Sequence, residues 1–154
     1  MKKYLIILFI ALTVSVQAQM QTIGYYPNWW YGSVNASDID FHSLTYVIVF
    51  SAQDASASAP YFQNSSDDGY YFEQLVTAAH AAGTKVLISV TGGYRQTQMP
   101  IVAADLAKCS TFVSTACAWA QARGLNGIEI DWEFPRATDA VGWNQLIRLF
   151  RNDL

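Results

Sequence analysis

Residues 125 to 135 read Leu125-Asn126-Gly127-Ile128-Glu129-Ile130-Asp131-Trp132-Glu133-Phe134-Pro135 and alternate acidic with large apolar side chains. Side chains of an extended strand point alternately to its two faces, so Glu129, Asp131 and Glu133 are expected on one face. The apolar set on the other face can then be buried under a covering layer. Three carboxylates in a row repel one another, and removing them from water adds to that cost. The pattern therefore favours a chemical site on a central strand over a solvent-facing acidic edge, which is the alternative.

The composition limits the class of protein. The chain has 154 residues, of which 52% are hydrophobic and 14% charged, with a formal net charge of −3. This length and apolar content suit one domain with a substantial core. The absence of a basic footprint excludes nucleic acid as an expected partner. Aromatic residues gather between Tyr25 and Tyr31, which suits sugar faces or protein surfaces, although burial in a core is the default for any one of them.

The N-terminus has the pattern of a signal peptide. A short basic start is followed by an apolar run over residues 4–16 and by small residues at the positions that a signal peptidase reads. We expect residues 1–18 to be removed after Ala18, leaving a domain over residues 19–154. The apolar run is shorter than the roughly 20 residues of a membrane-spanning helix. The sequence thus predicts a secreted or periplasmic protein with no membrane contact after cleavage.

The two cysteines, Cys109 and Cys117, predict neither a metal site nor a simple disulfide. On one helix they would lie about 12 Å apart along the axis, too far for a bridge. A bridge requires that Cys109 precede the helix and that the chain turn back. Their spacing matches no zinc pattern, and His42 and His80 form no cluster with them. We expect Cys117 in the core, and no metal or cofactor.

Strand-like and helix-like segments alternate along the chain. The predicted strands cover residues 22–26, 44–50, 85–90 and the carboxylate stretch. The predicted helices cover residues 70–82 before Gly83, from Ser110 or Thr111 to about Arg123 before Gly124, and 139–153. Residues 51–66 read as a long surface loop. This order predicts an α/β fold with a parallel sheet and right-handed connections.

Several informative residues fall at the C-terminal ends of the predicted strands: Trp29, Trp30, Gly92, Gly93 and Glu133. In α/β barrels and doubly wound sheets, that end of the sheet carries the chemistry.

Four motifs in order make the chain resemble the N-terminal half of a family 18 glycoside hydrolase, the chitinase group. The fourth-strand signature of that family, Asp-Gly-x-Asp-x-Asp-x-Glu, is similar to the stretch from Asn126 to Glu133. The other three are a third-strand motif over residues 85–92, a first-strand Gly-Tyr-Tyr at residues 24–26, and Phe50 at the end of the second strand. The resemblance covers residues 23–154 and implies a (β/α)8 barrel, represented here by about its first four βα units.

The resemblance also implies a mechanism, in which the substrate supplies the nucleophile. Glu133 would be the general acid and base, and Asp131 would hold the acetamido group of an N-acetylglucosamine unit. Glu129 would share a proton with Asp131. Ser89 and Tyr25 would point inward and hydrogen-bond the deep pair.

Further substrate-binding residues are implied in the same way: Trp29, Trp30, Gly92, Gly93 and Trp132. Trp29 and Trp30 would stack on sugar rings, or else be buried under the loop after the first strand. The implied partner is chitin or another glycan containing N-acetylglucosamine.

Three residues depart from the family pattern. Asn126 and Glu129 replace aspartates, and Thr91 stands in place of a glycine. The extra methylene of Glu129 would crowd the interior and could push Asp131 out of position.

The family also has later strands that supply a Tyr and a Trp to the sugar site. This predicts a missing C-terminal half or self-association, because four strands leave two open edges. The alternatives to a chitinase are a non-catalytic glycan-binding lectin, an inactive remnant, or an endo-β-N-acetylglucosaminidase.

Overall fold

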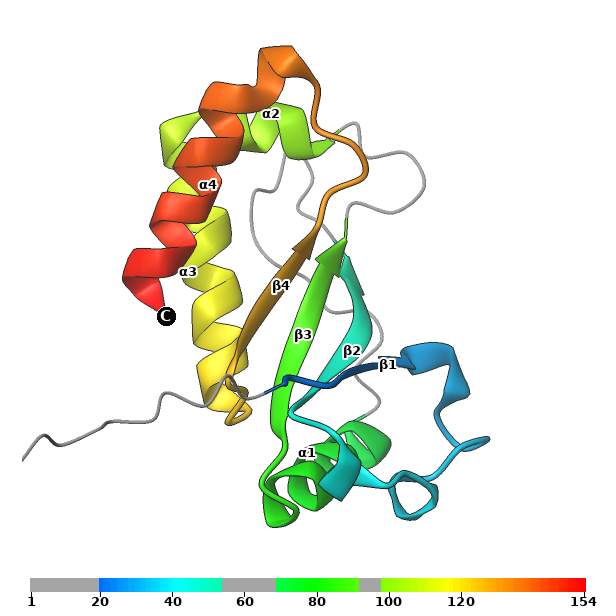
Figure 1. Cartoon of the computed structure of the whole chain (residues 1–154). Coiled ribbons are helices and arrows are strands. Elements are labelled where there is room, and N and C mark those ends of the chain that lie inside the picture. Colours follow the sequence, from blue (N-terminus) through cyan, green and yellow to red (C-terminus); the bar gives the residue numbers. More distant parts are fainter. Residues whose placement is uncertain (1–19, 54–68, 92–97) are drawn as a thin grey trace, which may run out of the picture.

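Four parallel strands form one sheet in the order β1-β2-β3-β4 (Figure 1). The computed structural model describes residues 20–53, 69–91 and 98–154. The strands are β1 (Ile23–Pro27), β2 (Tyr46–Gln53), β3 (Lys85–Thr91) and β4 (Gly127–Asp131). Each strand pairs in parallel with its neighbour along the chain. The predicted parallel α/β arrangement is confirmed. The predicted signal peptide and most of the predicted loop over residues 51–66 lie outside the described residues, and β2 itself extends to Gln53.

The helices pack against one face of the sheet and against each other (Figure 1). They are α1 (Tyr70–Ala81), α2 (Gln98–Ala104), α3 (Leu106–Ala122) and α4 (Ala140–Asp153). Short 3-10 helices cover η1 (Asn28–Trp30), η2 (Ala36–Asp38), η3 (Phe41–Ser43) and η4 (Ala137–Asp139). The chain leaves α1 through Gly83, whose φ of 81° is easily reached without a Cβ atom. The helices predicted over residues 70–82 and 139–153 correspond to α1 and α4, and their boundaries are confirmed to within about one residue.

The predicted start of α3 at Ser110 or Thr111 is wrong. The helix begins at Leu106, after Asp105, whose carboxylate accepts hydrogen bonds from the backbone N–H groups of Ala107 and Lys108 at 3.0 and 3.1 Å. An aspartate in this position satisfies N–H groups that the first turn leaves unpaired. Thr111 lies inside the helix, where its hydroxyl donates to the carbonyl of Ala107.

Helix α2 was not predicted. Its sequence, residues 98–104, contains Pro100, which suggests a break in a helical pattern. Proline is tolerated in the first turn, however, where its missing N–H has no intrahelical partner. Met99, Val102 and Ala103 of this helix are buried and join the core.

Both cysteines lie in α3, are buried, and carry no disulfide. The expectation that Cys117 lies in the core is thus confirmed. Burial, with a smaller contribution from the charge of Asp153, raises the pKa of the Cys117 thiol to about 11, which fits an unreactive core residue.

No single helix within the described ranges is long and apolar enough to cross a membrane. Helices α2 and α3 pass the same test only as a pair, and the chain bends by 108° between them.

Alternation along the strands divides the sheet into an apolar face and a functional face. Val47, Val49, Val86, Ile88 and Val90 belong to the hydrophobic cluster under the helices, and Phe72 and Phe112 reach it from α1 and α3. The intervening residues of the strands point to the opposite face. That face carries the acidic residues of β4.

Asn126 fixes the start of β4 against β3. Its backbone N–H donates to the carbonyl of Val86 at 2.8 Å, and its side-chain Oδ1 accepts from the Val86 N–H at 2.8 Å. The same Oδ1 lies 2.9 Å from Nε2 of His80, which therefore donates to it from the last turn of α1. One amide thus joins β3, β4 and α1. Since a slip of one residue would exchange the two faces of β4, this contact helps to hold the acidic residues on their side.

Replacement of Asn126 by Ala should lower the free energy of unfolding by about 1–2 kcal/mol, because it leaves the Val86 N–H without its partner. His80→Ala removes only the exposed contact and should cost less than half as much. Urea unfolding of the two variants and the wild type measures this difference. Equal stability of Asn126→Ala and the wild type would show that the contact contributes nothing.

Candidate active site

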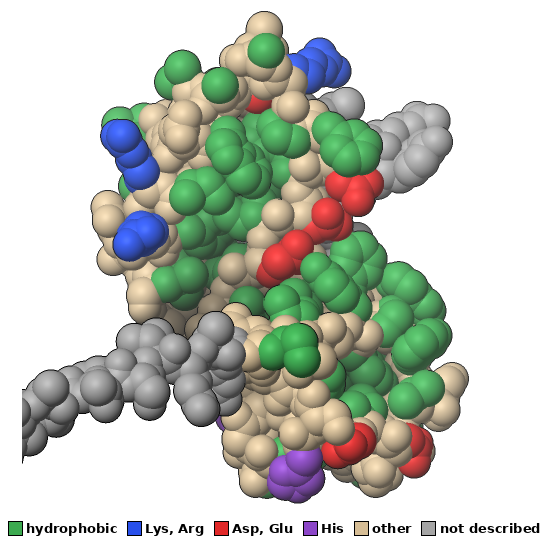
Figure 2. Space-filling view, in the orientation of Figure 1, with side chains coloured by type: hydrophobic (Ala, Val, Ile, Leu, Met, Phe, Trp, Pro, Cys, Tyr) green, Lys and Arg blue, Asp and Glu red, His purple; other side chains and the backbone are tan. Residues whose placement is uncertain are grey.

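The three carboxylates of the β4 stretch lie in a row and differ in depth. Glu129 pairs in register with Ser89 of β3, and Asp131 with Thr91. Glu129 and Asp131 are half-buried, whereas Glu133, just beyond the end of β4, is exposed. Figure 2 shows a row of acidic side chains across this face, with hydrophobic side chains on both sides. The predicted placement on one face of a strand is therefore confirmed for Glu129 and Asp131, whereas Glu133 lies just beyond the strand and lines the same pocket as Asp131.

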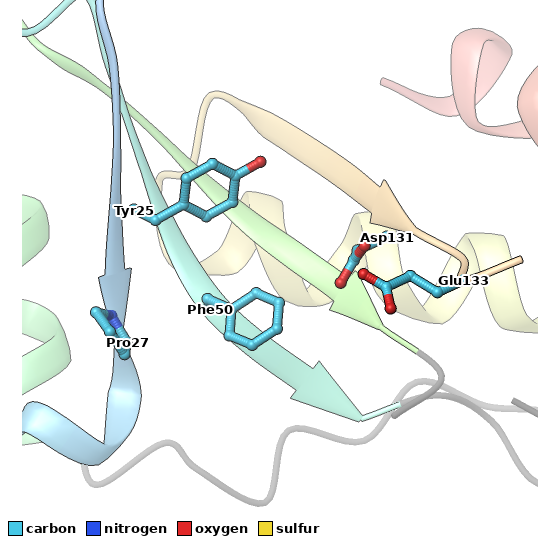
Figure 3. A pocket seen from close by; sticks show the side chains of 5 residues that line it. All are labelled: Tyr25, Pro27, Phe50, Asp131 and Glu133. Atoms are coloured by element: carbon cyan, nitrogen blue, oxygen red, sulfur yellow. The ribbon is translucent and has the colours of Figure 1, made fainter. Parts of the chain in front are cut away.

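The outer two acids line an open pocket of about 380 Å³. The other lining residues are Tyr25 and Pro27 of β1 and Phe50 of β2. In Figure 3 the Asp131 and Glu133 carboxyls lie next to each other, and the Tyr25 and Phe50 rings stand across the sheet from them. The pocket thus joins acidic groups on one side to aromatic rings on the other, as a site for a ligand with apolar and polar faces does.

Glu129 is the acid most affected by its surroundings. Burial raises the pKa of its carboxyl, the charge of Asp131 raises it further, and the nearby Ser89 hydroxyl acts in the opposite direction. Within the described residues, Oε2 of Glu129 and Oγ of Ser89 are both buried and neither meets the geometry of a hydrogen bond. Ser89 therefore faces the carboxylate, as predicted, but the predicted hydrogen bond is not formed.

Tyr25 also faces the acidic row. Burial raises the pKa of its hydroxyl, and the charges of Glu129 and Asp131 raise it further. Its ring packs edge-on against Phe50, with 6.5 Å between the centroids. The predicted inward orientation of Tyr25 agrees with this position, since both acids influence its hydroxyl.

The structure separates the three tryptophans that sequence analysis assigned to sugar binding. Trp29 is 65% exposed, and its ring lies 5.9 Å from that of Phe50, beside the pocket. Trp30 packs against Tyr26, whose side chain belongs to the core on the opposite face. The assignment of Trp132 is wrong. This residue is only 6% exposed and packs against Trp143 of α4, because it occupies the apolar face of the β4 stretch.

Two pocket residues, Pro27 and Phe50, were not assigned to the site from the sequence. Pro27 is the last residue of β1, and Phe50 lies in the C-terminal half of β2, where the β2–β3 register shifts between Val49 and Ala52. Their position in the C-terminal halves of these strands is the signal that could have identified them. The predicted site residues Gly92 and Gly93 lie outside the described residues.

The arrangement can perform acid–base chemistry. An exposed carboxyl at the rim can exchange a proton with both a bound ligand and water, while a deeper carboxyl of raised pKa retains its proton to higher pH. The profile of the family described as "Glycosyl hydrolases family 18" matches residues 21–154. The chain belongs to this family.

Relatives and solved structures agree with this membership. Chitinase 1 of Aphanocladium album is 35% identical over 71 residues, covering 46% of this chain and 17% of that protein. Putative chitinase 1 of Margaritifera margaritifera is 25% identical over 130 residues, covering 79% and 28%. The family 18 chitinase of Cycas revoluta in complex with (GlcNAc)3 has a TM-score of 0.77 at 17% identity, covering 86% and 40%.

The class V chitinase of Nicotiana tobaccum has a TM-score of 0.75 at 21% identity, covering 87% of this chain and 39% of its own. These similarities confirm the barrel-type fold over the matched part. The chain spans about two fifths of the length of these solved chitinases and less than a third of the curated relatives.

Stability of the protein should fall as Glu129 ionises. Its folded pKa lies above the ordinary value of 4.5, so the folded chain holds this proton more tightly than the unfolded chain. This contribution is fully present below pH 4.5 and is lost as pH rises through the folded pKa. Glu129→Gln has no such loss, so the free energy of unfolding of the variant minus that of the wild type should increase between pH 4 and pH 7.

Urea unfolding at intervals across this range measures the difference. In an Asp131→Asn background the increase should be smaller, because the charge of Asp131 is one cause of the raised pKa. A difference that does not vary with pH in either background would contradict the burial of an ionisable Glu129.

Proposed function

We propose that the protein is an exported glycosidase of the chitinase type, which hydrolyses β-1,4-linked N-acetylglucosamine polymers with assistance from the substrate. The observation that carries the proposal is the graded row of Glu129, Asp131 and Glu133, whose outer members line a pocket with aromatic walls. Family membership and the solved relatives that bind GlcNAc oligomers support the same substrate class. Export follows from the signal-peptide pattern of residues 1–18.

Glu133 is the general acid and base of the proposed reaction. It is exposed at the rim and lines the pocket, so its carboxyl can reach both a glycosidic oxygen and incoming water. In the first step, Glu133 gives its proton to the glycosidic oxygen as the bond to the anomeric carbon breaks. In the second step, it takes a proton from the water that attacks that carbon and breaks the carbon's new bond to the substrate's acetamido oxygen, which restores both the acetamido group and the protonated Glu133.

Asp131 orients the nucleophile, which is the carbonyl oxygen of the substrate's own acetamido group. A carboxylate beside Glu133 can accept a hydrogen bond from the acetamido N–H and stabilise the positive charge that develops when the carbonyl attacks. Glu129 lies two residues deeper along β4 and, with its raised pKa, can hold a proton next to Asp131. The deep acid thereby limits the number of negative charges in the pocket.

A non-catalytic glycan-binding protein is the second candidate. The observation in its favour is Glu129 itself, which is longer than the family aspartate and leaves Oε2 buried without a hydrogen-bond partner in the described part of the chain. Such crowding could impair the position of Asp131 without preventing glycan binding. Turnover, rather than binding, separates the two functions.

Glu133→Gln should lower turnover of N-acetylglucosamine tetramer by at least a factor of about 100, because the amide cannot donate the required proton. Binding of the tetramer should remain within a factor of about three, because the amide keeps the shape and the polar contacts of the carboxyl. Release of reducing ends measures turnover, and isothermal titration calorimetry measures binding.

Wild-type turnover that survives unchanged in Glu133→Gln would remove Glu133 from the acid role. Binding without turnover in the wild type would instead identify the protein as the glycan-binding alternative.

A further inference from the structure

The segment that carries Glu133 lies almost entirely at the surface. Parallel pairing of β4 with β3 ends at Asp131, so it does not hold the residues that follow. Trp132 is buried, whereas none of the residues from 133 to 141 is buried. Gly142, in the first turn of α4, is the next buried residue along the chain. The position of Glu133 therefore depends on how the two ends of this exposed segment are fixed.

The two ends of the segment are in contact with each other. The ring of Trp132 packs against the ring of Trp143 in α4, with 5.7 Å between the centroids and 57° between the planes. Trp132 is only 6% exposed, and Trp143 is half-buried. Aromatic rings at such a distance attract one another beyond the effect of the area that they bury. The contact thus closes the base of the exposed segment.

Helix α4 is held in turn by α2. Gly142 lies against Ala103, and a Cβ atom at position 142 would be 2.9 Å from the carbonyl carbon of Ala103, closer than real Cβ atoms come. The side-chain Nε2 of Gln145 donates to the carbonyl oxygen of Ala103 at 3.0 Å. Figure 1 shows α4 beside α2 and α3. These contacts fix the first turn of α4 and, with it, the place of Trp143.

A purely structural role of Trp143 is the alternative, since a half-buried ring stabilises the helix that carries it. What sets this ring apart is its partner. Trp132 is the residue between Asp131 and Glu133, and these two acids line the pocket together. A displacement of the Trp132 ring therefore reaches both acids through the backbone of a single residue.

We propose that Trp143 is a positioning residue for Glu133, that it acts through Trp132, and that the close approach of Gly142 to Ala103 sets its place. The proposal rests on the proposed function, because it concerns the geometry of the same acid. The contact between the two tryptophans keeps the Glu133 carboxyl beside Asp131, where it can reach the glycosidic oxygen. Without the contact, the exposed segment moves, and the carboxyl is in position for proton transfer less often.

The test compares Trp143→Ala with Phe150→Ala, a matched change in the same helix. Phe150 is 4% exposed and packs edge-on against Phe112 of α3, with 6.2 Å between the centroids, so its loss also removes an aromatic contact of α4. Trp143→Ala should lower turnover of N-acetylglucosamine tetramer by about tenfold to a hundredfold, because a small displacement of a catalytic group has an effect of this size. Its affinity for the tetramer should change by less than about threefold, since the loss falls on the transition state. Turnover by folded Phe150→Ala should stay unchanged.

Further variants separate the ring contact from general packing. Trp143→Phe keeps a ring against Trp132 and should restore most of the lost turnover. Gly142→Ala should lower turnover as Trp143→Ala does, because its Cβ atom would push α4 away from Ala103. Val141→Ala alters the neighbouring side chain, which is 82% exposed, and is the control for that change. Thermal melting checks that each variant is folded, and Trp143→Leu, which keeps apolar volume without the ring, carries the test if Trp143→Ala does not fold.

Hydrogen exchange of the peptide over residues 128–133 gives a readout that does not require turnover. Exchange there should become faster in Trp143→Ala and not in Phe150→Ala, because only the first change releases the end of the β4 stretch. Equal effects of the two variants would reduce Trp143 to a structural role and overturn the proposal, as would unchanged turnover or unchanged exchange in Trp143→Ala. If the wild type shows no turnover while exchange still responds to Trp143→Ala alone, the proposed function fails and the positioning contact stands.

Discussion

The site and the core both depend on the alternation of side chains along β4. One set of positions, Ile128, Ile130 and Trp132, packs toward the helices, and the other, Glu129, Asp131 and Glu133, faces the pocket. The parallel pairing of β4 with β3 fixes which set faces which way. Because the period is two, no intermediate register exists, and a slip by one residue would bury three acids and expose the apolar set. The hydrophobic contacts of Trp132 on the opposite face of the β4 stretch thus help to hold the acidic face in place.

The position of each acid along the chain sets its depth and, in the proposed reaction, its role. Glu129 lies beside the buried Ser89 in the interior of the sheet, and Glu133 lies beyond the last paired residue of β4. Desolvation disfavours the charged form of a carboxyl, and it is the main cause that raises the pKa of Glu129, the deepest of the three acids. Identical chemical groups can consequently serve different steps of one reaction, because the strand carries them from the protein interior to solvent.

Sequence reasoning predicted features that arise from local patterns. Period-two alternation placed the three acids on one face, and continuous apolar runs marked β2 and β3.

The start of α3 was missed because its cap, Asp105, lies several residues before the side chains that suggested a boundary. Helix α2, which is short and carries Pro100 in its first turn, was not predicted. Trp132 was assigned to the substrate by resemblance, whereas the alternation itself placed it on the buried face. Phe50 was not assigned to the pocket, although its alternation with Val47 and Val49 of the core places it on the opposite, acidic face of the sheet.

The most direct test of the graded acidic row is an NMR titration of the Glu129 side-chain carboxyl carbon, in the wild type and in Asp131→Asn. The account predicts that Glu129 titrates above the ordinary glutamic acid pKa of 4.5, and that its pKa falls in the variant because one of the two raising causes has been removed. A Glu129 that titrates at the ordinary value in both proteins would contradict the account, since it would show that the carboxyl is neither buried nor close to Asp131.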